Sequence, residues 1–226
     1  MIPSLWLDRP YYSLDAYCKN RYGTKVYKIA LDAGLTCPNR DGTLGTGGCI
    51  FCSAGGSGDF AVKPMNSVAK QLEEGQAMFG KKKTGNSFIA YFQAYTNTYG
   101  DPAYLEEIYE EALKQPQIVG ISIATRPDCL PPVVLDILTS LKAKYPTKDI
   151  WCYTGYLFDS ELLTQSRATT AVTKDMLSLI DVLVDGKFVE ELKNISLAFK
   201  GSENQRIIDV QNSLKQNKVI ILKDYE

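Results

Sequence analysis

Residues 26–52 read VYKIALDAGLTCPNRDGTLGTGGCIFC and join a short apolar segment to a loop that carries three cysteines. The β-branched and aromatic residues of Val26–Leu31 favour a strand. The loop from Cys37 to Cys52 follows directly, and its glycines at 42, 45, 47 and 48 allow its backbone to approach a bound group closely. Because functional groups of parallel α/β folds stand on loops at the carboxyl ends of strands, we expect a site in this loop.

Cys37, Cys49 and Cys52 indicate an iron–sulfur site. Thiolates are typical cluster ligands, and the Cys-x-x-Cys spacing lets two of them bind one cluster from a single turn. Three ligands leave one iron of a [4Fe–4S] cluster open for a substrate or cofactor, as in other catalytic metal sites. The sequence therefore predicts a [4Fe–4S] cluster on these three residues. The remaining cysteines are isolated and are predicted to be buried or incidental thiols: Cys18, Cys129 and Cys152.

Two other uses of the thiols stay open. Cys-x-x-Cys also occurs in zinc sites and in thioredoxin-like redox pairs. A zinc site needs a fourth ligand, however, and the chain contains no histidine. A redox pair would make no use of Cys37 or of the glycine-rich insert. The missing histidine also excludes histidine-based acid–base catalysis, so we expect no catalytic side chain beyond the cluster ligands.

The composition is that of one globular α/β domain. Of the 226 residues, 45% are hydrophobic and 23% charged, which provides a full core. The net charge of -1 does not favour a nucleic-acid partner, although a local basic patch would still permit one. The sequence has no apolar run of membrane-spanning length, and Met1–Asp8 lacks the features of a signal peptide. We therefore expect a cytoplasmic protein without a membrane partner. Lys81–Lys83 is expected to be a solvated loop.

Strand and helix patterns alternate along the chain. Further strands are predicted at 87–92, 118–123, 149–153, 181–184 and 219–222. Helices are expected to begin at three caps, which are Ser67, Asp101 with Pro102, and Thr173. A fourth helix should carry the apolar stripe Val134, Ile137, Leu138 and Leu141. Six alternating units predict parallel strands in a partial (βα)6 barrel, within a single domain that covers residues 1–226.

The spacing Cys-x11-Cys-x2-Cys resembles the cluster loop of elongator-type radical SAM proteins. More specifically, residues from about 10 to 145 resemble a bacterial subgroup of that family. The matching segments are 22–27, 36–42, 47–52, 91–97 and 124–129. This resemblance implies an oxygen-sensitive enzyme of anaerobic metabolism that cleaves S-adenosylmethionine (SAM) reductively to methionine and a 5′-deoxyadenosyl radical. It also implies that SAM binds the open iron and that a flavodoxin or ferredoxin type of protein donates electrons.

The same resemblance assigns SAM contacts to two loops. Gln93, Tyr95 and Asn97 stand where related enzymes bind the SAM amino group, and Arg126 follows the third strand, where it would meet the SAM carboxylate. Two further contacts rest on physical reasoning about strand ends, namely Thr154 near adenosine and Asp185 on a ribose hydroxyl. Ordinary loop or turn hydrogen bonding stays open as the alternative for each of these residues.

From about residue 147 onward, the chain resembles another radical SAM family, the activating protein of anaerobic ribonucleotide reductase. The matching segments are 149–156, 181–188 and 201–209. The chain thus resembles a chimera of a cluster-binding half, 1–146, and a distal half, 147–226. The activating family's own Cys-x3-Cys-x2-Cys motif is absent.

Three functions follow as expectations. The first is a radical SAM oxidoreductase with SAM and a [4Fe–4S] cluster as cofactors. The second is a glycyl-radical activating enzyme with anaerobic ribonucleotide reductase as its partner. The third is a non-catalytic iron–sulfur or zinc protein.

Overall fold

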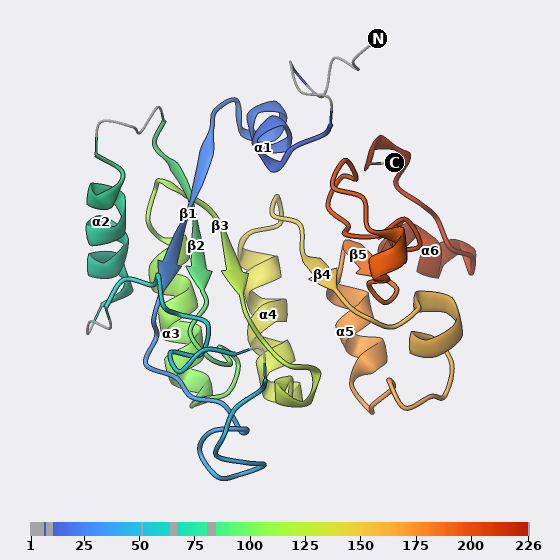
Figure 1. The fold of residues 1–226 in the computed structure, drawn as a ribbon, viewed down its shortest axis with the longest axis horizontal. Helices are drawn as coiled ribbons and strands as arrows, with labels where there is room; N and C mark the ends of the chain where they lie inside the picture. The colour runs from blue at the N-terminus through green and yellow to red at the C-terminus, as the bar shows by residue number, and fades with distance from the viewer. Residues whose placement is uncertain (1–6, 8–10, 51, 64–66, 81–84, 226) are drawn as a thin grey trace. The chain divides into compact units, whose positions relative to one another are not determined.

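The computed structural model describes residues 7, 11–50, 52–63, 67–80 and 85–225. The predicted solvated loop Lys81–Lys83 lies outside the described residues. The chain divides into two compact units (Figure 1). The cysteine unit is Tyr22–Ile137, and the distal unit combines Met1–Arg21 with Leu138–Glu226. Each unit contains a three-stranded sheet, so the predicted α/β class is confirmed. Among the described helices, none is long and apolar enough to span a membrane.

The sheet of the cysteine unit has the order β1-β2-β3, and both pairings are parallel. Its strands have the predicted bounds: β1 is Val26–Leu31, β2 is Ser87–Phe92 and β3 is Ile118–Ile123. Leu31 and Phe92 are paired in register and both are fully buried. The arrows of β1, β2 and β3 point toward the same end in Figure 1, where the loop after β1 lies.

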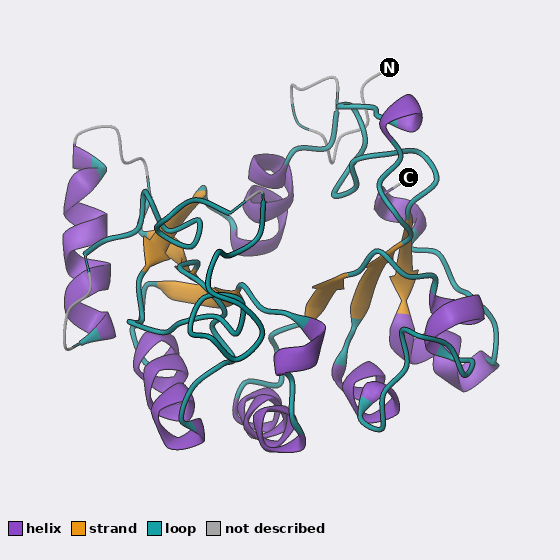
Figure 2. Ribbon diagram, turned by 60° about the horizontal axis from the view of Figure 1, so that its bottom comes forward, coloured by secondary structure: helices purple, strands orange, loops and turns teal. Residues whose placement is uncertain are grey.

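Two helices cover this sheet, with α2 (Val68–Met78) packed on β1 and α3 (Pro102–Leu113) packed on β3 and on α2 (Figure 2). The predicted caps of these two helices are confirmed. Ser67 Oγ accepts a bond from Lys70 N at 3.3 Å, and Asp101 accepts one from Tyr104 N at 3.1 Å. Glu111 of α3 adds a cap that the sequence did not predict, because its carboxylate accepts the first amides of α2, from Val68 and Ala69, each at 3.0 Å.

The segment after β3 forms a short 3-10 helix, η3 (Pro127–Cys129), and then α4 (Pro132–Lys144). Three residues of the predicted apolar stripe of α4, Val134, Ile137 and Leu141, are buried, and the fourth, Leu138, is half-buried. The division between the two units falls within this helix, after Ile137.

The distal sheet differs from the predicted parallel arrangement. β4 (Trp151–Tyr153) pairs parallel with β5 (Val182–Asp185), but β6 (Arg206–Asp209) pairs antiparallel with β5. The chain between β5 and β6 contains only the 3-10 helix η5 (Glu190–Leu192). A parallel return requires a longer crossover, usually an α-helix, and this connection does not supply one.

The predicted sixth strand at 219–222 is also wrong. After α6 (Val210–Gln216), Asn217 adopts the left-handed conformation with φ 50° and reverses the chain. The following residues return beside β6, with a single antiparallel bridge between Ile208 and Ile221. β6 therefore takes the place that the apolar pattern had assigned to residues 219–222.

The remaining helices within the described residues are α1 (Leu14–Tyr22), α5 (Thr173–Leu179), a π-helical turn η4 (Phe158–Leu162) and a final 3-10 helix η6 (Lys223–Tyr225). Thr173 was predicted to cap α5, but it is the first helical residue and Val172 precedes it without a capping bond. The Thr173 hydroxyl accepts instead from Thr170 N at 2.8 Å, within the turn before the helix.

A buried ion pair holds β5 and β6 together. Asp185 is fully buried, and its carboxylate accepts bonds from Arg206 Nε at 3.0 Å and Nη2 at 2.5 Å and from Phe158 N at 2.8 Å. Arg206 also pairs with Asp159 at 2.9 Å. These bonds compensate a carboxylate that would otherwise be very costly to bury.

Removal of Arg206 is expected to destabilise the distal unit. Arg206→Ala would leave the buried Asp185 charge without its cation, which costs about 3–5 kcal/mol. Urea unfolding measures this loss. As a control, Lys193→Ala breaks an ion pair whose side chains are 53% and 68% exposed, and it should change stability by less than about 0.5 kcal/mol. Equal effects of the two substitutions would contradict the importance of the buried pair.

Candidate functional site

The loop after β1, which carries the three cysteines, folds into consecutive turns. Cys37 O accepts bonds from Arg40 N at 2.8 Å and Asp41 N at 3.1 Å, and Asn39 O accepts one from Gly48 N at 2.9 Å. Cys49 O accepts a bond from Cys52 N at 3.0 Å. Gly48 has a φ of +74°, and a Cβ there would lie 2.7 Å from the Arg40 guanidinium. The loop therefore needs glycine at this position.

Each of the three cysteine sulfurs faces a side-chain donor. Asn39 Nδ2 lies 3.1 Å from Cys49 Sγ, Ser57 Oγ lies 3.7 Å from Cys52 Sγ, and Arg126 Nη1 lies 3.8 Å from Cys37 Sγ. Such donors stabilise the negative charge of thiolates and of cluster sulfurs. Sequence reasoning did not assign these roles to Asn39 and Ser57. The position of Asn39 in the quoted Thr36–Gly42 segment was the only signal.

The thiols differ in acidity. Burial raises the pKa of Cys37, but hydrogen bonds from the Thr96 side chain, the Asn39 backbone and Arg126, with the Arg126 charge, bring it below the ordinary value. Burial raises the pKa of each thiol that was predicted to be structural, and those thiols are Cys18, Cys129 and Cys152. Cys37 is thus disposed to be a thiolate and the other three are disposed to stay protonated.

Arg40 ties the end of the loop together, a role that sequence reasoning missed. Its Nη2 donates to Cys52 O at 3.2 Å and Ser53 O at 2.5 Å, and its guanidinium lies 5.8 Å from the centre of the Tyr95 ring. Tyr95 has a φ of 64°, and its hydroxyl donates to Ala54 O at 3.2 Å. Tyr95, a predicted SAM contact, therefore packs against the cysteine loop.

Gln93 and Asn97 lie on the segment after β2. Gln93 Nε2 donates to Ser57 O at 2.5 Å. Asn97 is fully buried, and its Nδ2 donates to Ala94 O at 2.9 Å. Its Oδ1 has no hydrogen-bond partner within the described part of the chain. An amide oxygen without a partner is suited to accept a bond from a bound ammonium group.

Arg126 begins the turn after β3 and is held on two sides. Its Nε and Nη2 donate to the two carboxylate oxygens of Asp128 at 2.9 and 2.7 Å, while Nη1 faces Cys37. The Arg126 guanidinium, which was predicted to meet the SAM carboxylate, therefore lies beside the cysteine loop. It is already paired with the Asp128 carboxylate.

The predicted contacts Thr154 and Asp185 belong to the distal unit and have internal partners there. Thr154 Oγ1 accepts from Tyr156 N at 3.2 Å, and Asp185 is the buried partner of Arg206. Their contacts with adenosine and ribose stay predictions.

The distal motif 201–206 also makes internal contacts. Gln205 Oε1 accepts from Gly201 N at 2.9 Å, Gln205 Nε2 donates to Gly186 O at 3.0 Å, and Asn204 Nδ2 donates to Lys187 O at 2.7 Å. These bonds connect the motif to the turn after β5. The motif leads directly into β6.

The three thiols are the kind of ligand that iron–sulfur clusters use. The described residues contain no group of three or more His, Cys, Asp or Glu side chains that could hold one metal ion. In a [4Fe–4S] cluster each cysteine binds a different iron, so its ligand sulfurs stand further apart than those around one ion. Three thiols on one loop, each with a nearby donor, fit this chemistry.

A family model described as the 4Fe-4S single cluster domain matches residues 87–208. The matched range begins after Cys52, so it does not include the three cysteines of the loop. No solved structure gives a significant match.

Curated relatives fall into two groups. The uncharacterized protein YtqA of Bacillus subtilis (strain 168) is 45% identical over 137 residues, which are 61% of this chain and 42% of YtqA. Protein YhcC of Escherichia coli (strain K12) is 44% identical over 122 residues, 54% of this chain and 38% of YhcC. The anaerobic ribonucleoside-triphosphate reductase-activating protein of the same strain is 42% identical over 74 residues, 33% of this chain and 43% of that protein.

The matches thus cover about two fifths of each of these relatives. The first and third matches, 137 and 74 residues long, are together shorter than the 226 residues of the chain. The resemblance predicted from the sequence, to a radical SAM-like chimera that includes part of the activating protein, is confirmed.

The pH dependence of alkylation should separate Cys37 from Cys129. A lowered pKa means that the reactive thiolate forms at lower pH, so Cys37 should react with iodoacetamide at lower pH than Cys129 does. Arg126→Ala removes a hydrogen-bond donor and a positive charge. It should therefore shift the midpoint of the pH dependence of Cys37 alkylation to higher pH. Peptide mass spectrometry of the cluster-free chain measures both rates. Lys114→Ala, whose ion pair with Glu110 lies at the end of α3, is the control. An unchanged Cys37 midpoint in the Arg126 variant would contradict the assigned cause.

Proposed function

We propose, since the chain belongs to the 4Fe-4S single cluster domain family, that Cys37, Cys49 and Cys52 hold a [4Fe–4S] cluster at which SAM is cleaved. The observation that carries this proposal is the set of donors at the three sulfurs, from Asn39, Ser57 and Arg126. The segments after β2 and β3, which supply Gln93 and Arg126, meet the connection that carries the cysteines at the carboxyl ends of β1–β3, where parallel α/β proteins bind ligands.

The chemistry that the cluster supplies when bound is one-electron reduction of SAM, which gives methionine and a 5′-deoxyadenosyl radical. The chain's own residues would hold the reactants. Asn39 and Ser57 would donate to the ligand sulfurs, which favours the reduced form by stabilising added negative charge. Arg126 would share its guanidinium between Asp128 and the SAM carboxylate.

The segment after β2 would bind the SAM amino group. Gln93 uses its amide nitrogen on Ser57 O, which leaves its amide oxygen available to accept a bond. Asn97 offers a buried amide oxygen without a partner. Tyr95 would form a wall of the site through its contact with Arg40. For the architecture, we retain the partial (βα)6 barrel as a proposal, with the antiparallel β6 as its last strand.

Substitution of the ligands tests the cluster directly. Cys37→Ala, Cys49→Ala and Cys52→Ala should each abolish iron binding after anaerobic reconstitution with iron and sulfide, because each removes one of three ligands. The matched controls Cys18→Ala, Cys129→Ala and Cys152→Ala should retain it. Iron content and the visible absorbance of the cluster are the measurements. Iron lost from Cys129→Ala but kept in Cys37→Ala would refute the ligand assignment.

SAM cleavage tests the enzyme class. The reduced, reconstituted chain should slowly form 5′-deoxyadenosine and methionine without a substrate. Arg126→Ala should weaken SAM binding by about 1.5–3 kcal/mol, because a charge-assisted bond is lost. Asp128→Asn is the matched control, since it removes the carboxylate partner but leaves Arg126 free for SAM. If both variants bind SAM equally, Arg126 acts only in the turn. Iron without any SAM cleavage would favour a non-catalytic iron–sulfur protein.

A second candidate function is activation of a glycyl-radical enzyme. The observation that favours it is the 42% identity over 74 residues to the activating protein. The motif 201–206 has internal contacts with Gly186 and Lys187, so its presence is explained by the fold of the distal unit without a partner. We therefore rank activation of a glycyl-radical enzyme below the first proposal, in which the chain cleaves SAM without such a partner.

Glycyl-radical spectroscopy separates the two functions. Mixing the reduced chain, SAM and an anaerobic ribonucleotide reductase should give only a weak glycyl-radical EPR signal, while SAM is still cleaved. The loops of the cysteine unit would not match such a partner, because the activating family's own cluster motif is absent. A full radical yield at substoichiometric amounts of the chain would overturn this ranking.

A further inference from the structure

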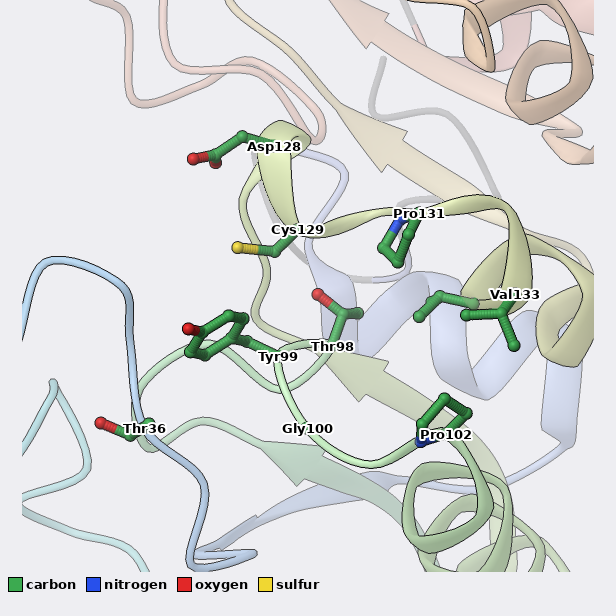
Figure 3. A pocket seen from close by; sticks show the side chains of 10 residues that line it. Thr36, Thr98, Tyr99, Gly100, Pro102, Asp128, Cys129, Pro131 and Val133 are labelled. Carbon is green, nitrogen blue, oxygen red and sulfur yellow. The ribbon is translucent and has the colours of Figure 1, made fainter. Parts of the chain in front are cut away.

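A cavity of about 570 Å³ lies beside the cysteine loop, within the cysteine unit. Its wall includes Thr36, which precedes Cys37, and residues from the segments after β2 and β3 (Figure 3). The volume is in the range of small-molecule sites in proteins, which is roughly 300–1,000 Å³. The cavity is therefore large enough for a ligand, and it adjoins the proposed cluster site.

The wall of this cavity is mostly apolar. Pro102 at the start of α3 and Pro131, Val133 and Val134 around the start of α4 contribute carbon atoms, and Tyr99 adds its ring. Figure 3 shows the side chains of Pro102, Pro131 and Val133 on one side of the cavity and those of Tyr99, Cys129 and Thr36 on the other.

The polar groups in the wall are largely paired with each other or with neighbours. Both oxygens of Asp128 accept bonds from Arg126 at 2.9 and 2.7 Å, so this carboxylate is neutralised within the protein. Tyr99 OH is bonded to Thr43 at 3.0 Å, and the Thr98 hydroxyl is bonded to Thr125 at 2.5 Å. A charged ligand would find no unpaired opposite charge among these groups. The cavity is suited to a neutral group with an apolar body.

Cys129 is the exception among the buried polar groups of the wall. Its side chain is 5% exposed, lines the cavity, and makes no hydrogen bond to the described residues. Its backbone amide bonds to Arg126 O at 3.0 Å, which fixes the residue beside the guanidinium that faces Cys37. A buried thiol that lines a ligand-sized space, without a protein partner, is available to contact a ligand.

We propose that this cavity binds the neutral aromatic or branched aliphatic part of a small organic substrate, with Cys129 in contact with it. The inference rests on the proposed function, because the neighbouring cluster site would supply the chemistry that makes the bound molecule a substrate. The cavity itself is defined by its lining residues. Access to the proposed cluster would lie past Thr36, the residue before its first ligand.

Labelling of Cys129 with probes of different shape and charge tests the proposal. Benzyl methanethiosulfonate transfers its benzylthio group to the thiol. A new S–S bond forms, the S–SO2 bond of the reagent breaks, and methanesulfinate leaves with the electron pair while the thiol proton goes to water. The anionic 2-sulfonatoethyl methanethiosulfonate reacts by the same step. The rate with the benzyl reagent is divided by the rate with the anionic reagent, first in the folded chain and then in urea. The first ratio divided by the second reports the preference of the folded cavity for the benzyl group.

The benzyl reagent should be preferred at Cys129 at least tenfold relative to the unfolded chain. Cys18 is the internal control, because it is also buried, at 2% exposure, burial raises its pKa as well, and it lies in the distal unit. It should react slowly with both reagents. Peptide mass spectrometry distinguishes the cysteines. A ratio at Cys129 that equals the unfolded ratio, or a rate as slow as that of Cys18, would overturn the proposal.

Two variants keep the test independent of misfolding. Val133 is 42% exposed on the first turn of α4, so Val133→Phe should fold while narrowing the cavity, and it should slow benzyl labelling of Cys129 about tenfold. Asp136→Phe, on an exposed position of the same helix outside the wall, should leave the rate unchanged. Labelling needs no cluster, so iron content tests the proposed function separately. A cluster-loaded chain whose Cys129 shows no benzyl preference would refute this inference alone.

Discussion

Parallel pairing of β1, β2 and β3 is the constraint on which the candidate site depends, because parallel strands end at one edge of their sheet. The hydrogen bonding continues beyond that edge. Thr96 N donates to Thr36 O at 3.2 Å, and Asn97 N donates to Ala124 O at 2.8 Å. These bonds join the segments after the three strands in the same order as the strands themselves. The cysteine loop is thus held against two loops that are distant in sequence.

The joined loops create two chemically different environments for cysteine. On the side of the loop, Cys37 meets hydrogen-bond donors and the Arg126 charge, which together outweigh the effect of burial on its pKa. On the side of the cavity, burial raises the pKa of Cys129, and its thiol has no partner among the described residues. Arg126 separates them, since its side chain faces Cys37 and its carbonyl accepts the Cys129 amide. One arginine therefore contacts a thiol of the cysteine loop with its side chain and fixes, through its carbonyl, a residue of the cavity wall.

The distal unit is organised by contacts of another kind. The Asp185–Arg206 pair joins β5 to β6, and an aromatic cluster joins α1 to the end of the chain. Tyr17, Trp151 and Phe199 pack edge-on or tilted, with ring centroids 5.2 to 5.9 Å apart. Such pairs add stability beyond the burial of their area. The segments of this unit that resemble the activating protein thus include residues that serve its own fold, and the resemblance of 201–206 is not by itself evidence of a partner.

The amino-acid sequence by itself determined the three strands of the cysteine unit, the caps of α2 and α3, and the glycine-rich cysteine loop. These features depend on neighbouring residues, since alternation, capping and spacing are local properties. Only the tertiary structure decided that β6 is antiparallel and that the apolar segment 219–222 makes a single bridge. It also decided that Asn39, Ser57 and Arg126 face the sulfurs and that Cys129 faces a cavity. Arg126 and Cys37 are 89 residues apart, and no local pattern encodes a contact that forms only when separate strands end at the same edge.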